Sequence, residues 1–324
     1  MITITPPESL PEKAKGRHFR AEKFDFASFF FTALTGLATL FILAILALIL
    51  LNIFINGWRG LSWHFVSSIP KKDFFDASTT GVLPMIVGTT VRVVVMTIFV
   101  LPVGVITAIY LTEYAASNSP ITKIIRAAVN NLAGVPSIVF GLFGLGFFIN
   151  FVGKNMDAAL HTPGAVWGQP ALIWAALTLA VMMMPVVIVA TEESLKAIPS
   201  GLREASLALG ATKLETVLRV VLPQALPGIL TGGILAVSRA AGEVAPILFT
   251  GVAYYMASLP HHVTDQFMDL GYHVFVLSTQ SPNIEKTRPI LYATVLVLLM
   301  LTFALNIVAI VIRTRVRKKL RALG

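Results

Sequence analysis

The sequence lacks cysteine and is poor in charge. Without cysteine, a disulfide framework, a thiolate metal site and a cysteine nucleophile are all excluded. Charged residues make up only 13% of the 324 residues, about half of what a soluble domain carries, whereas hydrophobic residues make up 56%. The mean hydropathy is +0.81, and several apolar runs reach the roughly 20 residues needed to cross a bilayer. The sequence therefore predicts an all-α polytopic membrane protein.

Motifs typical of enzymes are also missing. The chain has no G-x-x-x-x-G-K-[ST] phosphate loop, so it is not itself an ATPase. Neither G-x-S-x-G nor H-E-x-x-H is present, which argues against an intramembrane protease. The histidines at His261, His262 and His273 have no acids beside them in metal-ligand spacing. We therefore expect no catalytic residue and no metal site.

The apolar segments are numerous and long enough for six membrane helices. Their expected bounds are 29–56, 83–112, 125–150, 171–191, 226–250 and 290–312. The third segment is rich in glycine, which allows close helix approach, and Pro185 in the fourth predicts a kink. An even number of spans places both ends of the chain on the same side of the membrane.

Lysine and arginine are distributed unevenly between the two sides of this topology. The side that holds both ends carries 17 of them, including Arg126 at the edge of the third segment, and the opposite side carries 6. Because cytoplasmic loops carry an excess of Lys and Arg, we expect both termini and the loop 192–225 in the cytoplasm. Residues 1–28 are then a cytoplasmic tail, and the basic C-terminus 313–324 touches anionic membrane lipid. The net charge of +9 reflects this topology and not nucleic-acid binding.

The loop 192–225 has a helix-turn-helix pattern of its own. Gly210 is placed to end a first short helix, as a C-cap glycine does. Thr212 and Glu215 form a capping-box pattern that starts a second helix, which we expect to stop before Pro223. An ordinary interhelical loop that happens to be helical is one interpretation. The other is a helix that docks into a groove on a soluble subunit.

This loop resembles the motif E-A-A-x3-G-x9-I-x-L-P of permease subunits of bacterial ABC importers. Ser206 and Val220 replace an alanine and the isoleucine of the motif, and the spacing fits without a gap. The resemblance implies that the loop is a coupling helix that docks on an ATPase subunit. The matching residues in this chain are Glu204, Ala205, Gly210, Leu222 and Pro223.

The fifth apolar segment carries two charges at membrane depth, Arg239 and Glu243. A spacing of four residues places both on one face of a helix. Charges in a membrane are costly and usually face a pathway or a partner, although a structural pair that only fixes helix packing has the same sequence. Arg92 is a further cation within a span, for which snorkelling or pairing inside the bundle is the favoured interpretation.

Residues 238–250 (SRAAGEVAPILFT) resemble the R-x-A-G-E-x-A-P-L-L-F-T segment of the PstA-type permease of bacterial phosphate ABC importers. Residues 109–114 (IYLTEY) resemble the Y-L-x-E-Y of that family, and residues 135–143 (VPSIVFGLF) resemble its P-S-I-V-x-G-L-F. The resemblance covers about residues 80–312. Val244 departs from it, because threonine is common there in the family.

This resemblance implies a type I ABC-importer permease architecture with phosphate as the substrate. Arg239 is then the residue that attracts phosphate, Glu243 holds Arg239 or accepts a hydrogen bond from protonated phosphate, and Arg92 is a less certain member of the pathway. ATP and Mg²⁺ are expected on a homodimeric ABC ATPase, with no cofactor on this chain. A second permease and an external or periplasmic phosphate-binding protein complete the importer in the bacterial inner membrane.

Two other functions stay open on the sequence. An ABC permease for another oxyanion, such as sulfate or molybdate, shares the coupling loop and differs in the pocket of the fifth span. A membrane sensor that reports phosphate status is also compatible with the sequence, since a transport complex can signal as well.

Overall fold

The computed structural model describes residues 26–70, 75, 80–116 and 118–321, and these residues are mostly helical. None of the described residues forms a sheet, and Val252 and Phe267 make an isolated bridge. The chain divides into two compact units, residues 1–52 and residues 53–324, which we describe separately. Most of the expected tail 1–28 and the last three residues lie outside the described residues.

Helix α1 (Phe26–Trp58) supplies the described part of the first unit. It is apolar on every side, and the hydroxyls of Thr32, Thr35 and Thr39 donate to carbonyls one turn earlier. A helix of 33 residues is about 50 Å long, which is more than enough to cross a bilayer. These three hydroxyls are satisfied within the helix, as a lipid environment requires.

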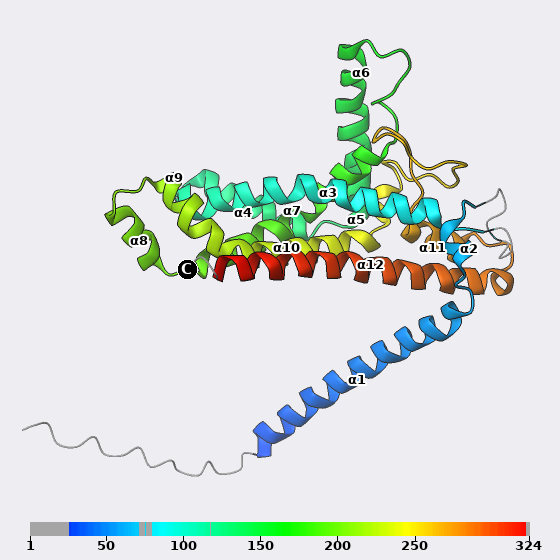
Figure 1. The fold of residues 1–324 in the computed structure, drawn as a ribbon, viewed down its shortest axis with the longest axis horizontal. Helices are drawn as coiled ribbons and strands as arrows, with labels where there is room; N and C mark the ends of the chain where they lie inside the picture. Colours follow the sequence, from blue (N-terminus) through cyan, green and yellow to red (C-terminus); the bar gives the residue numbers. More distant parts are fainter. Residues whose placement is uncertain (1–25, 71–74, 76–79, 117, 322–324) are drawn as a thin grey trace, which may run out of the picture. The chain divides into compact units, whose positions relative to one another are not determined.

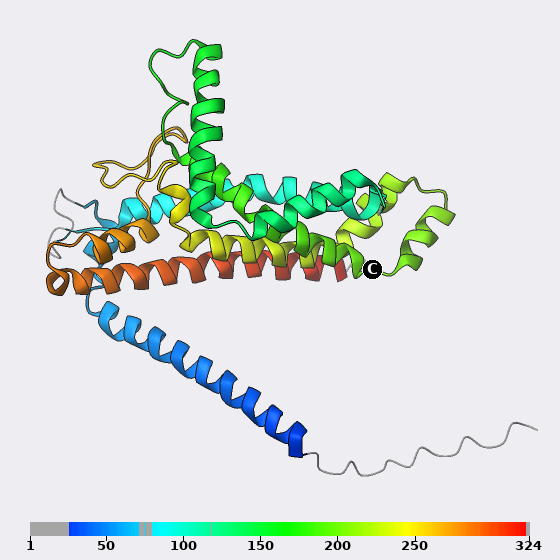
Figure 2. The ribbon, with the colours of Figure 1, turned by 180° about the vertical axis from the view of Figure 1, so that it is seen from behind.

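Four long helices of the second unit lie side by side and enclose its core (Figures 1 and 2). They are α3 (Leu83–Ile109), α7 (Leu172–Lys196), α10 (Leu222–Gly242) and α12 (Ile284–Arg321). Helix α7 packs against both α3 and α10, and α10 packs against α12. Buried Met96, Leu179 and Met183 belong to the apolar cluster among them. Outward-facing Ile98 and Phe303 are exposed, as expected of surfaces that contact lipid.

Shorter elements connect these helices. They are α2 (Trp63–Ser67), the π-helical turn η1 (Tyr110–Tyr114), the 3-10 turn η4 (Ala245–Ile247) and α11 (Leu270–Thr279). Helix α11 packs against α12 and α3. The loop before α11 is thereby placed at the end of the bundle where α10 stops.

Six helical segments of the described chain are long and apolar enough to cross a membrane, which confirms the predicted number. They are Phe26–Trp58, Leu83–Tyr114, Ser137–Leu160, Leu172–Lys196, Lys213–Gly242 and Ile284–Lys319. The second, fourth and sixth fall where the sequence predicts them and run further at one or both ends. The third and fifth differ from their expected bounds.

The predicted third span, 125–150, is wrong in its bounds. Its first part belongs to a separate amphipathic helix, α4 (Pro120–Ala133). The membrane-length helix begins only after Pro136, because proline disfavours helical conformation in the residue before it. Its parts are α5 (Ser137–Phe143), the π-helical η2 (Gly144–Gly153) and α6 (Lys154–Leu160). In Figure 1, α6 rises away from the four long helices.

The predicted fifth span, 226–250, begins too late, and the expected helix stop before Pro223 is wrong. Helical backbone runs without a break through α9 (Lys213–Thr216), the π-helical η3 (Val217–Val221) and α10. In η3 the amide of Leu222 donates to the carbonyl of Val217, one residue further back than in an α-helix. This wider turn leads into α10, and Pro223 follows it directly without interrupting the helical backbone.

Candidate functional site

Two short helices, α8 (Ser200–Ala208) and α9, are joined at a glycine and lie at one end of the bundle (Figure 1). Gly210 has φ of +86°, a left-handed conformation that glycine adopts without steric cost. The hydroxyl oxygen of Thr212 accepts from the amide of Glu215 at 3.3 Å, and a Glu215 carboxylate oxygen accepts from the amide of Thr212 at 2.9 Å. The predicted glycine break and capping box are both confirmed.

Replacing Thr212 with alanine is expected to destabilise α9 locally by about 1 kcal/mol, because the cap loses its side-chain acceptor. Faster amide hydrogen exchange across residues 213–216 in the purified protein measures this loss. Thr302→Ala is the matched control, since its hydroxyl bonds within α12 and does not cap α9. Unchanged exchange in Thr212→Ala would show that tertiary contacts hold α9 without the cap.

The outer surface of this loop combines a carboxylate with exposed apolar side chains. Glu204 and Ala205 are exposed on α8. Leu207 is 48% exposed and Leu209 is 89% exposed. Neighbouring leucines that a loop leaves uncovered are typical of a surface that binds another protein.

Arg203 fixes the inner surface of α8 to the ends of two spans. Its guanidinium donates to both carboxylate oxygens of Glu113, at 2.8 and 3.3 Å, and to the carbonyls of Leu195 and Ile198, each at 2.8 Å. Paired hydrogen bonds between charged groups are among the strongest that a side chain makes. Sequence reasoning missed this role, although Glu113 lies in the Y-L-x-E-Y segment and Arg203 lies next to Glu204.

Arg239 and Glu243 meet where α10 ends. Arg239 lies in the last turn of the helix, whereas Glu243 has an extended backbone with ψ of 129° and lies just beyond it, so the prediction that both lie on one helix face is wrong. The Arg239 Nε is nevertheless 3.3 Å from a Glu243 carboxylate oxygen. The Arg239 side chain is 56% exposed and that of Glu243 is 21% exposed. This chain therefore presents a charge pair that its own bundle does not cover.

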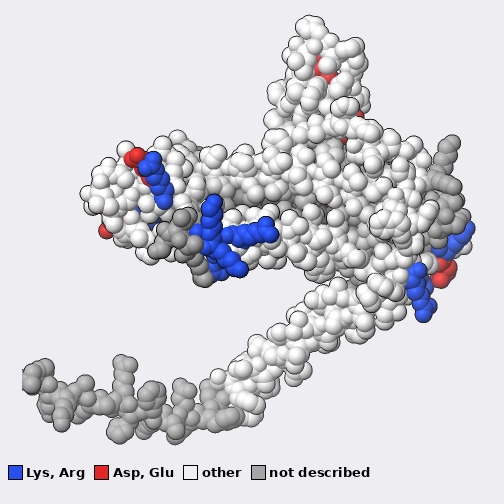
Figure 3. Space-filling view, in the orientation of Figure 1, with Lys and Arg blue, Asp and Glu red and all other residues white. Residues whose placement is uncertain are grey.

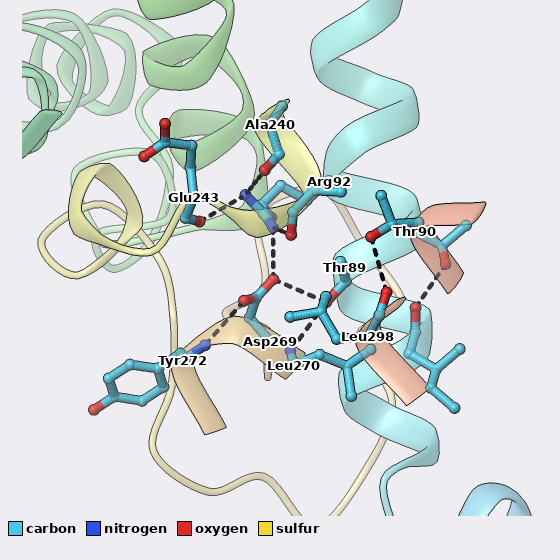
Figure 4. Close-up of polar contacts among 12 residues, drawn as sticks. Thr89, Thr90, Arg92, Ala240, Glu243, Asp269, Leu270, Tyr272 and Leu298 are labelled. Atoms are coloured by element: carbon cyan, nitrogen blue, oxygen red, sulfur yellow. Dashed lines mark hydrogen bonds and ion pairs between the residues drawn. The ribbon is translucent and has the colours of Figure 1, made fainter. Parts of the chain in front are cut away.

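Arg92 lies close to this pair but is enclosed (Figure 4). Its side chain and that of Asp269 are both fully buried, with 2.8 Å between guanidinium nitrogen and carboxylate oxygen. The same guanidinium donates to the backbone carbonyls of Ala240 and Glu243. Arg92 thus pairs within the bundle, as the favoured interpretation of the sequence has it.

Sequence reasoning did not find Asp269 as the partner of Arg92. A buried arginine requires a counter-charge, so the sequence signalled that an acid is needed. It gave no means of choosing one, because Asp269 lies in a loop far along the chain from α3. Only the packing of that loop against α3 brings the two together.

A smaller set of basic side chains lies beside acidic ones at one end of the second unit, and a larger set gathers at the other end (Figure 3). The larger set lies on the last turns of α12, at Arg313, Arg315, Arg317, Lys318 and Lys319, and around the α8–α9 loop. Arg313 also donates to the hydroxyl of Thr231 on α10 at 3.1 Å. Figures 1 and 2 agree that the end of α12 and the α8–α9 loop lie at the same end of the bundle.

An apolar helical bundle with a projecting helix-turn-helix loop and a charge pair at the end of a span is the arrangement expected of the membrane subunit of a transporter. The model of the family of binding-protein-dependent transport system inner membrane components matches residues 100–322, and the chain belongs to this family. It is a permease subunit of an ABC importer, a multi-pass inner-membrane protein and not an enzyme. Permeases of this class work with a partner permease, an ATPase and a binding protein.

Individual relatives agree with this assignment. The chain is similar to the probable ABC transporter permease protein YqgI of Bacillus subtilis, with 36% identity over 219 residues and 68% of each chain covered. It is 34% identical over 228 residues to the phosphate transport system permease protein PstA 1 of Mycobacterium tuberculosis, which covers 68% of this chain and 66% of the relative.

A solved structure confirms the predicted type I importer fold. This structure is a bacterial alginate ABC transporter in complex with an alginate pentasaccharide-bound periplasmic protein. A chain of it superposes with a TM-score of 0.62 at 14% identity, covering 87% of this chain and 93% of that one.

Proposed function

We propose that this permease moves inorganic phosphate across the cytoplasmic membrane, as the PstA-type subunit of its importer. The observation that carries the proposal is the ion pair of Arg239 and Glu243. The Arg239 side chain is more than half exposed, although it lies at the end of a membrane-length helix. A charge that the bundle leaves uncovered at this position suits a translocation pathway. Relatives named as phosphate permeases support phosphate as the anion.

The chemistry of the pair fits phosphate. A guanidinium offers a planar fork of donors that matches two oxygens of an oxyanion. Phosphate at neutral pH still carries a proton, which a carboxylate such as Glu243 can accept in a hydrogen bond. Sulfate is fully ionised, so the same carboxylate repels it, and specificity follows from this repulsion as much as from attraction to Arg239.

Coupling to ATP is assigned to the α8–α9 loop. The exposed surface around Glu204, Ala205, Leu207 and Leu209 docks on one subunit of a homodimeric ABC ATPase, which binds ATP and Mg²⁺. Arg203 then passes the movement of α8 to the spans through its contacts with Glu113 and the end of α7. Gly210 keeps the turn tight, and Leu222 and Pro223 continue the loop directly into α10.

The remaining partners are proposed by analogy with the permease family to which the chain belongs. A second permease faces the exposed Arg239 and completes the pathway, which this chain only half encloses. A periplasmic phosphate-binding protein delivers the substrate from outside. Both termini and the α8–α9 loop lie in the cytoplasm, where the basic end of α12 meets anionic lipid.

Uptake by the reconstituted importer tests the proposal. Vesicles that contain the permease pair, the ATPase and the binding protein should take up labelled phosphate only with internal ATP, and excess sulfate or molybdate should not compete. Competition by either anion would favour the alternative of a permease for another oxyanion. ATP hydrolysis without uptake of any of these anions would favour the sensor alternative.

A further inference from the structure

The buried Arg92 side chain holds the end of α10 in place. Its guanidinium nitrogens donate to the carbonyls of Ala240 at 3.1 Å, Ala241 at 3.4 Å and Glu243 at 3.4 Å. The last carbonyls of a helix lack partners within the helix, and a cation near them is also favoured by the helix dipole. Arg92 supplies both donors and charge to this end, from the neighbouring helix α3.

Asp269 holds Arg92 from the other side (Figure 4). One of its carboxylate oxygens accepts from Arg92 at 2.8 Å and from the hydroxyl of Thr89 at 2.9 Å. The other accepts from the amide of Tyr272 at 3.1 Å and so caps the start of α11. The hydroxyl of Thr89 in turn accepts from the amide of Leu270 at 3.0 Å. One carboxylate therefore joins α3, α11 and, through Arg92, the end of α10.

The backbones around this network are in direct contact. A Cβ atom on Gly88 of α3 would collide with the carbonyl oxygen of Met268, beside Asp269. A Cβ atom on Gly271 would lie 2.8 Å from a methyl carbon of Val244, the residue after Glu243. The segment around Asp269 is thus packed closely between α3 and the end of α10.

We propose that Arg92 and Asp269 are positioning residues that fix the end of α10, and with it the placement of Arg239 and Glu243. The importance of this positioning for transport rests on the proposed function of the exposed pair of Arg239 and Glu243. A buried ion pair costs desolvation energy that an apolar pair of similar size avoids. Mutual neutralisation therefore does not explain why charged residues are present at positions 92 and 269. Only the guanidinium can serve three carbonyls at once.

A thiol reporter tests this proposal without phosphate. The chain has no cysteine, so Gly242→Cys introduces its only thiol. Gly242 is exposed at the end of α10, and a Cβ atom there meets nothing within 4 Å. Gly134→Cys, just after α4, is the matched control, because Gly134 is also exposed and a Cβ atom there meets only the carbonyl oxygen of Asn131, at an ordinary contact distance of 3.6 Å. The labelling rate of this subunit by a maleimide is measured in the assembled importer.

Three changes are compared on each reporter: Asp269→Asn, Arg92→Met, and the double change Arg92→Met with Asp269→Leu. We expect each to raise the labelling rate of the Gly242→Cys reporter about tenfold, as local opening increases, and to leave the labelling rate of the Gly134→Cys control unchanged. The double variant carries no uncompensated buried charge, so it tests the positioning role even where a single variant fails to assemble. A wild-type labelling rate in the double variant overturns the proposal, because the pair would then only neutralise itself.

Uptake measurements on the same variants separate this proposal from the proposed function. Raised labelling with lost phosphate uptake supports both. Raised labelling with normal phosphate uptake leaves the positioning role standing and shows that the pair of Arg239 and Glu243 is not the phosphate site.

Discussion

Replacing Arg239 with alanine is expected to lower labelled phosphate uptake by about 100-fold, the scale of effect when a charged donor to an anion is removed. The guanidinium is exposed from this chain at the end of α10, so its loss takes a cation from the pathway and leaves Glu243 unpaired. An unpaired carboxylate in the pathway repels phosphate as well. Uptake by reconstituted importers with wild-type and Arg239→Ala chains, measured side by side, gives the ratio.

Arg288→Ala is the matched control for this experiment. Arg288 is 55% exposed and pairs with Glu285 at 3.1 Å, so it resembles Arg239 in exposure and in pairing but lies at the start of α12. We expect the control to transport normally, and both variants to assemble with the other subunits. Uptake that survives Arg239→Ala would leave the family assignment intact, move the anion site elsewhere and reduce Arg239 to a structural partner of Glu243.

Replacing Arg203 with alanine is expected to uncouple ATP hydrolysis from transport. The change removes the charged hydrogen bonds that connect α8 to Glu113 and to the end of α7, while the outer docking surface stays in place. The ATPase should therefore still bind and hydrolyse ATP, whereas phosphate uptake falls about tenfold, the scale of a lost charge-assisted contact. The measured quantity is ATP hydrolysed per phosphate imported.

Two further variants separate coupling from docking. Glu113→Gln keeps the shape of the acceptor, removes its charge and should raise the same ratio. Glu204→Lys reverses an exposed charge on the docking surface and should instead release the ATPase, which co-purification detects. A fully coupled Arg203→Ala importer would contradict the role of Arg203 and leave the loop to other contacts.

The features that the sequence determined by itself are local. Apolar length alone gave six spans, because a bilayer imposes the same minimum on every crossing helix. The glycine break at Gly210 and the capping box of Thr212 and Glu215 followed from backbone conformation and hydrogen bonds within four residues. The resemblances to the coupling loop and to the PstA-type segment also rest on contiguous patterns, and the coupling role of the loop stays a prediction.

Helix bounds failed where the sequence carried conflicting local signals. Pro136 ended a helical segment, but Pro223 did not, because the π-helical turn η3 leads into it. Glu243 is spaced to continue α10, yet its backbone is extended, with its carbonyl accepting from Arg92. Helix propensity within α10 does not decide whether the helix continues to Glu243, because Arg92 of the neighbouring helix α3 supplies the hydrogen-bond donor.

Only the tertiary structure decided which charges meet. Arg92 finds Asp269, and Arg203 finds Glu113, across long stretches of chain. The physical reason is that a buried charge needs a partner of opposite charge. The sequence shows that such a partner is needed, but any acid in the chain could be that partner. Which acid does so is fixed by how α3, α10 and the loop before α11 pack together.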